Sequence, residues 1–101
     1  MKAIRRADAE EWAAWFRALA DPTRLQVLNA IAAYGPELKI GELVARVDIG
    51  QSTVSHHVRV LAEVGFIVYV RDGTASRVSV NASCLSALPG AAGAILGPPA
   101  T

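Results

Sequence analysis

The stretch Lys39–Val80 reads KIGELVARVDIGQSTVSHHVRVLAEVGFIVYVRDGTASRVSV, and its hydrophobic period changes once along its length. In the first part, apolar residues recur at helical spacing on both sides of a three-residue turn, Asp48–Gly50. This spacing predicts a short helix over about 39–47 and a second helix from 51 to about 64. Gly65 follows, and we expect it to end the second helix in the left-handed conformation.

The rest of the stretch, from Phe66 onward, has the composition of β-strands. It is rich in Val, Ile and Tyr, and Asp72-Gly73 divides it in the middle. This pattern predicts two strands joined by a hairpin loop. Two short helices joined by a tight turn and followed by a hairpin make a winged helix-turn-helix, in which the second helix enters the major groove of DNA. The predicted fold class is therefore mainly α with a small two-stranded wing, a winged helix-turn-helix of about five helices.

Two more helices are predicted before this stretch. The first covers 9–20 with Asp8 as its N-cap. Its apolar face consists of Trp12, Trp15, Phe16 and Leu19. The second covers 22–33, with Asp21 as its N-cap and Pro22 in its first turn. More than half of its circumference is apolar, which is typical of a mostly buried helix, through Leu25, Val27, Leu28, Ile31 and Ala32.

The helix that begins at Gln51 has two chemically different faces. At about 100° per residue, Val54, Val58 and Leu61 lie together and are predicted to pack inward. The opposite face is polar, and no acidic residue occurs between 51 and 62; this face consists of Ser52, Ser55, His56 and Arg59. Such side chains can contact base edges or phosphates, and plain solvation of the face is the alternative interpretation. The hairpin adds Arg71 and Arg77 on either side of its loop, which favours DNA binding.

A catalytic role has little support in the sequence. Ser52 and His56 lie one helical turn apart, which is the spacing of a nucleophile and its base. No third group orients the histidine, and no oxyanion site is implied. We therefore expect that the protein is not an enzyme, and we assign no catalytic residue.

Length and composition indicate one small folded domain. The chain has 101 residues, of which 52% are hydrophobic, and a formal net charge of +1. Cys84 is the single cysteine, which excludes an intramolecular disulfide and a cysteine cluster for zinc. No uninterrupted apolar run approaches about 18 residues, and the first residues carry charges of both signs instead of a signal-peptide pattern. We expect a soluble, cytoplasmic protein with no membrane partner.

The C-terminal part of the chain is uncharged from Val78 to Thr101. So much apolar surface in a small domain predicts self-association as a homodimer. The expected dimer interface consists of Trp12, Trp15, Phe16, Leu85 and Leu88. The alternative is that the tail is partly disordered, because its prolines and glycines interrupt regular structure. We expect residues 1–88 to form the DNA-binding domain with its dimerisation helix, and residues 89–101 to form a partly ordered or disordered Ala/Gly/Pro-rich tail. On the alternative interpretation, the last ten residues are loose.

Two sequence strings resemble a known family. ALADPTRLQVLNAI (18–31) precedes the helix-turn-helix, and IGELVARVDIGQSTVSHHVRVLAEVGFIVYVRDG (40–73) contains it. Together they resemble the ArsR/SmtB family of bacterial transcriptional regulators over about residues 12–81. The resemblance implies a winged-helix dimer formed by the first and terminal helices, and an inverted-repeat operator in double-stranded DNA. It assigns the recognition contacts to Gln51, Ser52, Thr53, Ser55 and His56, with Arg59 near the DNA backbone and a basic wing matched loosely by Arg71 and Arg77.

The chain departs from the metal-sensing members of this family at both of their metal sites. The arsenic- and cadmium-type members carry Cys-Val-Cys where this chain has Lys39-Ile40-Gly41. The zinc-, cobalt- and nickel-type members carry His, Asp or Glu on the terminal helix, and this chain has none of these residues after Asp72. We therefore assign no metal ligand. A weakly bound divalent transition metal such as nickel or zinc stays open as an alternative.

Few groups remain that could sense a signal. His57 is predicted to be a hydrogen-bonded structural imidazole, and Cys84 a small buried hydrophobic residue or, less simply, half of a redox or metal pair across a dimer axis. Three functions stay open. The first is a DNA-binding regulator whose effector is unknown or is delivered by a separate effector-sensing protein. The second is a metal- or redox-responsive sensor with an unusual site. The third is a winged-helix protein-interaction module.

Overall fold

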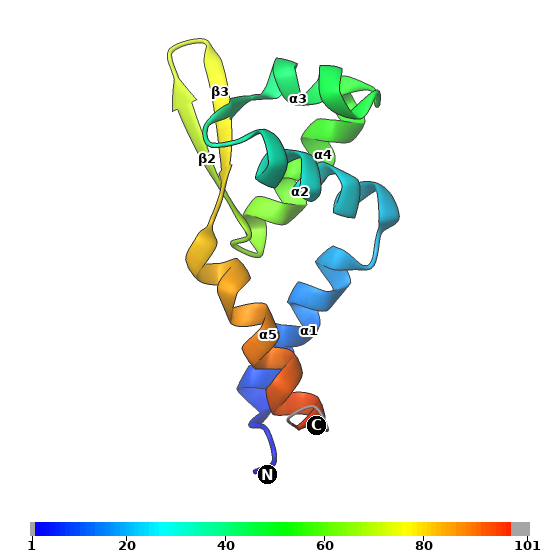
Figure 1. The fold of residues 1–101 in the computed structure, drawn as a ribbon, viewed down its shortest axis with the longest axis vertical. Coiled ribbons are helices and arrows are strands. Elements are labelled where there is room, and N and C mark those ends of the chain that lie inside the picture. The colour runs from blue at the N-terminus through cyan, green and yellow to red at the C-terminus, as the bar shows by residue number, and fades with distance from the viewer. Residues whose placement is uncertain (1, 98–101) are drawn as a thin grey trace.

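A computed structural model of the chain describes residues 2–97. Within this range the helices of the predicted helix-turn-helix are followed by a β-hairpin, and a helix stands at each end (Figure 1). The elements are α1 (Arg6–Leu19), α2 (Pro22–Tyr34), β1 (Leu38–Lys39), α3 (Ile40–Val47), α4 (Gln51–Glu63), β2 (Ile67–Asp72), β3 (Ala75–Val80) and α5 (Ala82–Leu96). The predicted winged helix-turn-helix is confirmed.

The sheet has three antiparallel strands in the order β1-β3-β2. The hairpin of β2 and β3, which is the wing, was predicted, and Tyr69 pairs with Val78 in its register. The strand β1 was not predicted, because two residues are too short for a period to show. It places Leu38 opposite Val78, and both side chains are buried. The base of the wing is thereby fixed to the body of the domain.

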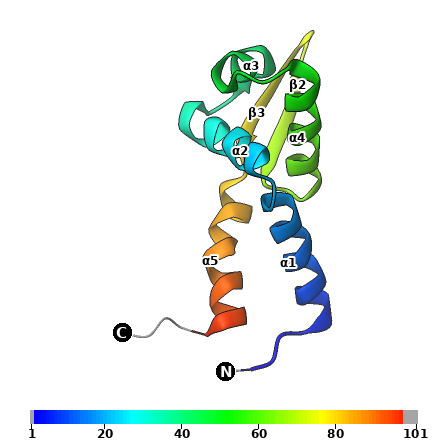
Figure 2. The same ribbon diagram turned by 90° about the vertical axis from the view of Figure 1, so that its right-hand side faces the viewer.

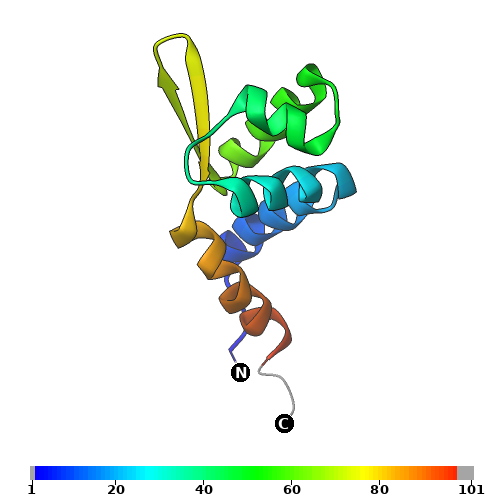
Figure 3. The same ribbon diagram turned by 45° about the horizontal axis from the view of Figure 1, so that its top comes forward.

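The core lies where α2, α3 and α4 meet the wing (Figure 3). Val54, Val58 and Leu61 are buried on α4, as predicted from their spacing. Phe66, the third residue after α4, is fully buried, and the centroid of its ring lies 6.1 Å from that of Trp15 on α1. The aromatic contact therefore joins α1 to the end of α4.

Gly65 ends α4 in the left-handed region, with φ of +86°, as predicted. The N–H of Gly65 donates to the carbonyl of Ala62, and the N–H of Phe66 donates to the carbonyl of Leu61, both at 3.0 Å. This pair of hydrogen bonds is a Schellman motif, which satisfies helix carbonyls that otherwise lack partners. The turn sends the chain directly from α4 into the wing.

The helices α1 and α5 extend from one end of the body, so the described part of the chain begins and ends on that side (Figure 2). The molecule is accordingly elongated, with extents of 48 × 26 × 21 Å. We call α1 and α5 together the arm. In this arrangement each helix of the arm can pack only part of its surface against the rest of the chain.

Two sequence predictions about the helices are wrong in detail. α1 begins at Arg6, so Asp8 lies inside its first turn instead of capping it, and its carboxylate accepts hydrogen bonds from Arg5 at 3.2 Å. Leu25 on α2 was expected to be buried, but it is 46% exposed, because α2 packs on only part of its circumference. The N-cap of α2 is confirmed, since the Asp21 carboxylate accepts the N–H of Arg24 at 3.0 Å.

The last helix extends beyond residue 88, into the segment that the sequence predicted to be a partly ordered or disordered tail. α5 continues through Pro89 to Leu96. A proline inside a helix removes one hydrogen bond and crowds the preceding turn. The helix packs against the core on both sides of the proline. Leu85 and Leu88 before it are half-buried, and Ala91 after it is buried. The alternative prediction of a loose end covered the last ten residues, 92–101. Residues 92–96 of that segment are helical, and residues 98–101 lie outside the described residues.

We expect Gly65→Ala to destabilise the fold by about 1–2 kcal/mol, the cost of a left-handed conformation for an L side chain. A Cβ at this position meets only the Sγ of Cys84, at an ordinary 3.8 Å, so backbone strain is the whole cause. The matched control is Gly41→Ala on α3, where φ is ordinary and a Cβ meets no atom within 4 Å. The control should raise helix stability by about 0.5–1 kcal/mol. Urea unfolding measures both, and equal effects would contradict the conformational argument.

Candidate nucleic-acid interface

The exposed face of α4 carries the residues that the sequence predicted to read DNA. Ser55 is half-buried, and the others are exposed, namely Gln51, Ser52, Thr53, His56 and Arg59. The buried residues of α4 occupy the opposite side. One face of α4 therefore presents hydroxyl, amide, imidazole and guanidinium groups, while its opposite face packs in the core.

The first turn of α4 has no side-chain cap, because its N-cap residue is Gly50. The first N–H groups of a helix have no partner inside it, and the helix dipole places partial positive charge there. No acidic residue lies in this first turn. This end of α4 therefore favours a negatively charged group beside Gln51 and Ser52.

The two wing arginines lie on opposite faces of the hairpin. Arg71 pairs with Ser76 and shares a face with Tyr69. Arg77 pairs with Val70 on the other face, is half-buried, and donates from Nη1 to the carbonyl of Glu37 at 3.4 Å. The sequence grouped these residues because of their charge, but only Arg71 shares the face of the wing that carries Tyr69 and Ser76.

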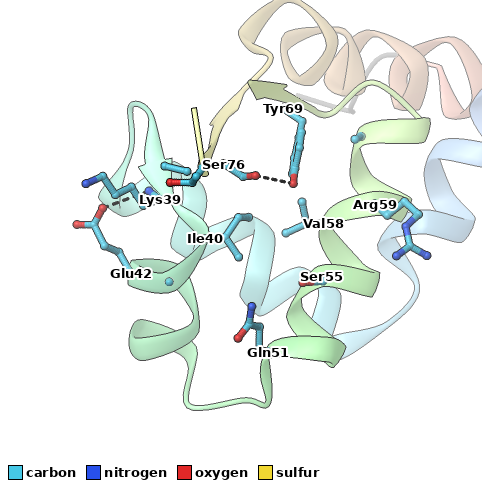
Figure 4. A pocket seen from close by; sticks show the side chains of 13 residues that line it. Lys39, Ile40, Glu42, Gln51, Ser55, Val58, Arg59, Tyr69 and Ser76 are labelled. Atoms are coloured by element: carbon cyan, nitrogen blue, oxygen red, sulfur yellow. Dashed lines mark hydrogen bonds between the residues drawn. The ribbon is translucent and has the colours of Figure 1, made fainter. Parts of the chain in front are cut away.

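An open groove of about 890 Å³ separates α4 from the wing (Figure 4). Ser55 and Arg59 line it on the α4 side, and Tyr69 and Ser76 line it on the wing side, with the Tyr69 hydroxyl donating to the Ser76 hydroxyl at 2.9 Å. Lys39 stands at the far end, where β1 meets α3. The sequence interpretation missed Lys39, Tyr69 and Ser76, because residues from three distant segments meet only in the folded chain.

Arg24 connects three helices behind the α4 face. Its Nε donates to the carbonyl of Ala18 near the end of α1, and its Nη1 lies 3.2 Å from Nδ1 of His57 on α4. A guanidinium only donates, so Nδ1 of His57 accepts and its proton resides on Nε2. His57 is the buried, hydrogen-bonded imidazole that the sequence predicted. The role of Arg24 itself was not predicted.

Burial is the main cause that lowers the pKa of His57. The negative charge of Asp21 opposes it, and the positive charge of Arg24 adds a smaller lowering effect. The Asp21 carboxylate is the N-cap of α2, and the hydrogen bond that it accepts from the backbone N–H of Arg24 lowers its pKa. The fold therefore holds His57 neutral and Asp21 charged. In these protonation states, both side chains accept hydrogen bonds from Arg24, where α1, α2 and α4 meet.

Comparison with known proteins identifies the family. Residues 21–69 match the family model for the bacterial regulatory protein, arsR family. The uncharacterized helix-turn-helix-type transcriptional regulator YceK of Bacillus subtilis is 30% identical over 78 residues, covering 77% of this chain and 78% of that protein. The chain belongs to the ArsR/SmtB family of transcriptional regulators.

A second relative agrees with this ArsR/SmtB assignment, and a solved structure agrees with the fold. The transcriptional repressor SmtB homolog of Synechocystis sp. is 38% identical over 65 residues, which are 64% of this chain and 48%, about half, of that protein. The solution structure of the homodimeric winged helix-turn-helix DNA-binding domain Mb0332 from Mycobacterium bovis superposes with a TM-score of 0.71 at 20% identity, over 88% of this chain and 84% of that one. The family consists of regulators and not of enzymes, as the sequence predicted.

The residues predicted for the dimer interface of this ArsR/SmtB-family chain differ in their burial. Trp15 is only 8% exposed and packs on Phe66 within the same chain, so its ring belongs to the core of the protomer. Trp12, Leu85 and Leu88 are half-buried against that core. Phe16 is 40% exposed, which leaves its ring accessible to a second molecule.

The residues considered for sensing are spread out in this ArsR/SmtB-family chain. In the described range 2–97, no three His, Cys, Asp and Glu side chains lie close enough together to hold a metal ion. Cys84 is half-buried, its Sγ lies 3.9 Å from the carbonyl of Val64, and burial, with Glu11 as a smaller cause, raises the pKa of its thiol. In the same range, no helix combines the length and apolarity that a membrane crossing needs.

The lowered pKa of His57 predicts how stability depends on pH. The unfolded chain binds the His57 proton near its ordinary pKa of about 6.5, whereas the folded chain binds it only at lower pH. The free energy of unfolding should therefore be highest above about pH 6.5 and should decrease as the pH falls toward about 5. His57→Asn should flatten this slope, since its side-chain oxygen can still accept from Arg24 but does not titrate.

Urea unfolding at several pH values between 5 and 7.5, at one protein concentration, measures the slope. The control is His56→Asn, which removes an exposed imidazole one residue away and should keep the slope. An unchanged slope in His57→Asn would show that His57 is not held neutral by the fold.

Proposed function

We propose that this chain is a homodimeric regulator that binds an inverted-repeat operator sequence-specifically and acts in the cytoplasm, where bacterial DNA is accessible. One observation carries this proposal, the exposed face of α4. It presents hydrogen-bonding and basic groups without any carboxylate from Gln51 to Ala62, on a helix whose other face is fixed in the core. Helices presented in this way read base edges in the major groove.

The contacts divide by chemistry. Ser52, Ser55 and His56 lie along the middle of the exposed face, where a helix in the major groove meets base edges. Arg59 and Arg71 lie toward the wing and are assigned to phosphates. With a net charge of only +1, long-range attraction to DNA is weak, so affinity depends on these local contacts.

Dimerisation is supported by the apolar surface of the arm. Phe16 on α1 is 40% exposed and Leu96 on α5 is 81% exposed, and Ile95 beside it is exposed as well. Large apolar side chains left exposed on the two helices of the arm favour association with a second molecule. The related Mycobacterium bovis domain is homodimeric. Two copies joined through their arms carry two α4 helices related by a two-fold axis, which matches an inverted repeat.

In vitro selection from randomised duplexes tests the function directly. The full chain should enrich duplexes with two inverted half-sites, whose centres are separated by about 10 base pairs or a multiple of that spacing. Enrichment of a single half-site would contradict the dimeric part of the proposal. Failure to enrich any duplex would contradict DNA reading and favour a protein-interaction module.

We expect Ser55→Ala and His56→Ala to weaken binding to the selected duplex by about 1–3 kcal/mol each, the usual scale of a lost base contact. Binding to a scrambled duplex should change little, because base contacts carry sequence information. The control is Gln26→Ala, which removes an exposed polar side chain on α2. Fluorescence anisotropy measures all affinities. Equal losses on both duplexes would assign these residues to the backbone instead of the bases.

We expect Phe16→Glu to convert the dimer into a monomer in sedimentation velocity at micromolar concentration. The position is exposed within the protomer, so the new carboxylate should leave the fold intact but cannot be buried between two chains without a large cost. The control, Gln26→Glu, adds the same charge outside the arm. Affinity for the selected duplex should fall only in Phe16→Glu. A dimeric Phe16→Glu variant would exclude this face of α1 from the interface.

A further inference from the structure

We propose that Arg24 is a positioning residue for DNA reading, which fixes the direction of α1 relative to α4 through His57, and that a proton on His57 releases this contact and weakens operator binding. The inference rests on the proposed function, because that function assigns α1 to the dimer and α4 to the DNA. It adds the group that holds these two helices in one geometry. We call the contacts from Ala18 through Arg24 to His57 the Arg24 bridge.

The Arg24 bridge begins at the C-terminal end of α1. The carbonyl of Ala18 is one of the last four of this helix, which find no partner inside it, and the Nε of Arg24 donates to it. The guanidinium also places a positive charge at the negative end of the helix dipole. Its Nη1 lies 3.2 Å from Nδ1 of His57, which is only 7% exposed. One planar group on α2 thus connects α1 with α4.

The contacts between α1 and the body lie near the C-terminal end of this helix, because the rest of α1 extends away (Figure 2). The buried residues of α1 are Trp15 and Ala18. The Trp15 ring packs on Phe66, and an apolar contact of this kind has little directional preference. The Arg24 bridge adds a directional contact about one turn further along α1. The two contacts together fix the direction of the helix, whereas one alone allows it to swing.

In the proposed dimer, the direction of α1 decides where the two α4 helices lie. The arms join the two copies, so the distance between the α4 helices depends on how each α4 is held relative to its own α1. An inverted repeat requires both helices to reach their half-sites at one spacing. The buried face of α4 holds this helix within its own protomer. Loss of the bridge should therefore weaken binding to two half-sites together and leave a single half-site readable.

A proton on His57 removes the contact with Arg24. Neutral His57 accepts at Nδ1, whereas its charged form carries N–H on both nitrogens and accepts from no donor. Two donors and two positive charges would then face each other at 3.2 Å. Either the imidazole or the guanidinium must move, and in both cases the bridge opens.

The charged groups around His57 determine the direction of the pH effect. Asp21 and Arg24 face it from α2, and His56 faces it from its own helix. From α1, the junction receives the uncharged carbonyl of Ala18. Burial is the main cause that lowers the pKa of His57, Asp21 opposes this effect, and Arg24 adds to it.

The form with the closed bridge therefore binds fewer protons than the open form. Because the closed form fits the operator, proton uptake opposes operator binding. Operator affinity should be highest above about pH 6.5, the ordinary pKa of histidine, and should decrease as the pH falls toward about 5.

The test measures binding of the full chain to two duplexes over a pH series by fluorescence anisotropy. The first is the selected duplex with both half-sites, and in the second one half-site is scrambled. Between about pH 7.5 and about pH 5, wild-type affinity for the first duplex should fall about tenfold, the scale of a lost hydrogen bond to a charged group. Affinity for the second duplex should not fall. Circular dichroism and sedimentation velocity define the pH range of the folded dimer, in which the affinities are compared.

His57→Asn keeps an acceptor for Arg24 but does not titrate. It should bind the selected duplex as wild type does at about pH 7.5 and should keep that affinity in acid. The control is His56→Asn, which removes the exposed neighbouring imidazole. This control should bind both duplexes more weakly, since His56 is assigned to a base contact, but it should retain the loss in acid.

Arg24→Lys keeps the positive charge but lacks the planar fork that contacts Ala18 and His57 together. At about pH 7.5 it should bind the selected duplex about tenfold more weakly than wild type, and acid should change this affinity little. The matched control is Arg17→Lys, which makes the same exchange at an exposed position of α1 and should bind as wild type. If Arg24→Lys does not fold, His57→Asn decides the test.

A His57→Asn variant that loses affinity in acid as wild type does would overturn the proposal. A wild-type affinity that is constant over the pH series would overturn it as well. Equal losses in acid on both duplexes would also contradict it, because they would assign the effect to folding or to α4 alone. A wild-type chain that selects no duplex at all would instead overturn the proposed function, so the two failures are distinguishable.

Discussion

Burial of the α4 ridge formed by Val54, Val58 and Leu61 sets the rotation of that helix, and most of the functional argument depends on it. The three side chains are almost completely inaccessible to solvent, and each contributes about 1.5–3 kcal/mol by leaving water. Because successive residues of a helix differ by about 100°, a rotation by one residue would expose this ridge and bury polar groups. The core therefore decides which side chains of α4 are offered to DNA.

Two further constraints fix this helix, one at its C-terminal end and one on its buried side. At its C-terminal end, Gly65 turns the chain so that Phe66 enters the core and the wing begins at once. On its buried side, Arg24 joins His57 to the end of α1. The Arg24 guanidinium thus bridges α1 of the arm and α4.

The charge of the protein is nearly balanced, and the structure places it unevenly. The exposed face of α4 carries no acid from Gln51 to Ala62, and only its last residue, Glu63, is acidic. The ion pairs of the described residues lie at the start of α1, between Arg5 and Asp8 and between Arg6 and Glu10. Exposed pairs of this kind contribute little to stability. Basic and hydroxyl groups instead lie on α4 and around the groove beside it. Local arrangement, more than net charge, fits the chain for a nucleic acid.

The sequence by itself determined the order of elements, the turn at Asp48–Gly50, the wing and the inward ridge of α4, because these depend on local periodicity and turn chemistry. It also placed His57 in a buried, hydrogen-bonded position. Only the tertiary structure decided the rest. β1, the Arg24 junction and the groove join segments far apart in the chain, and no local pattern reports such contacts. Arg71 and Arg77 look equivalent in sequence, but strand pairing places them on opposite faces. Helix α5 continues through Pro89 because Ala91 is buried and Leu88 packs against the core. This packing outweighs the tendency of proline to end a helix.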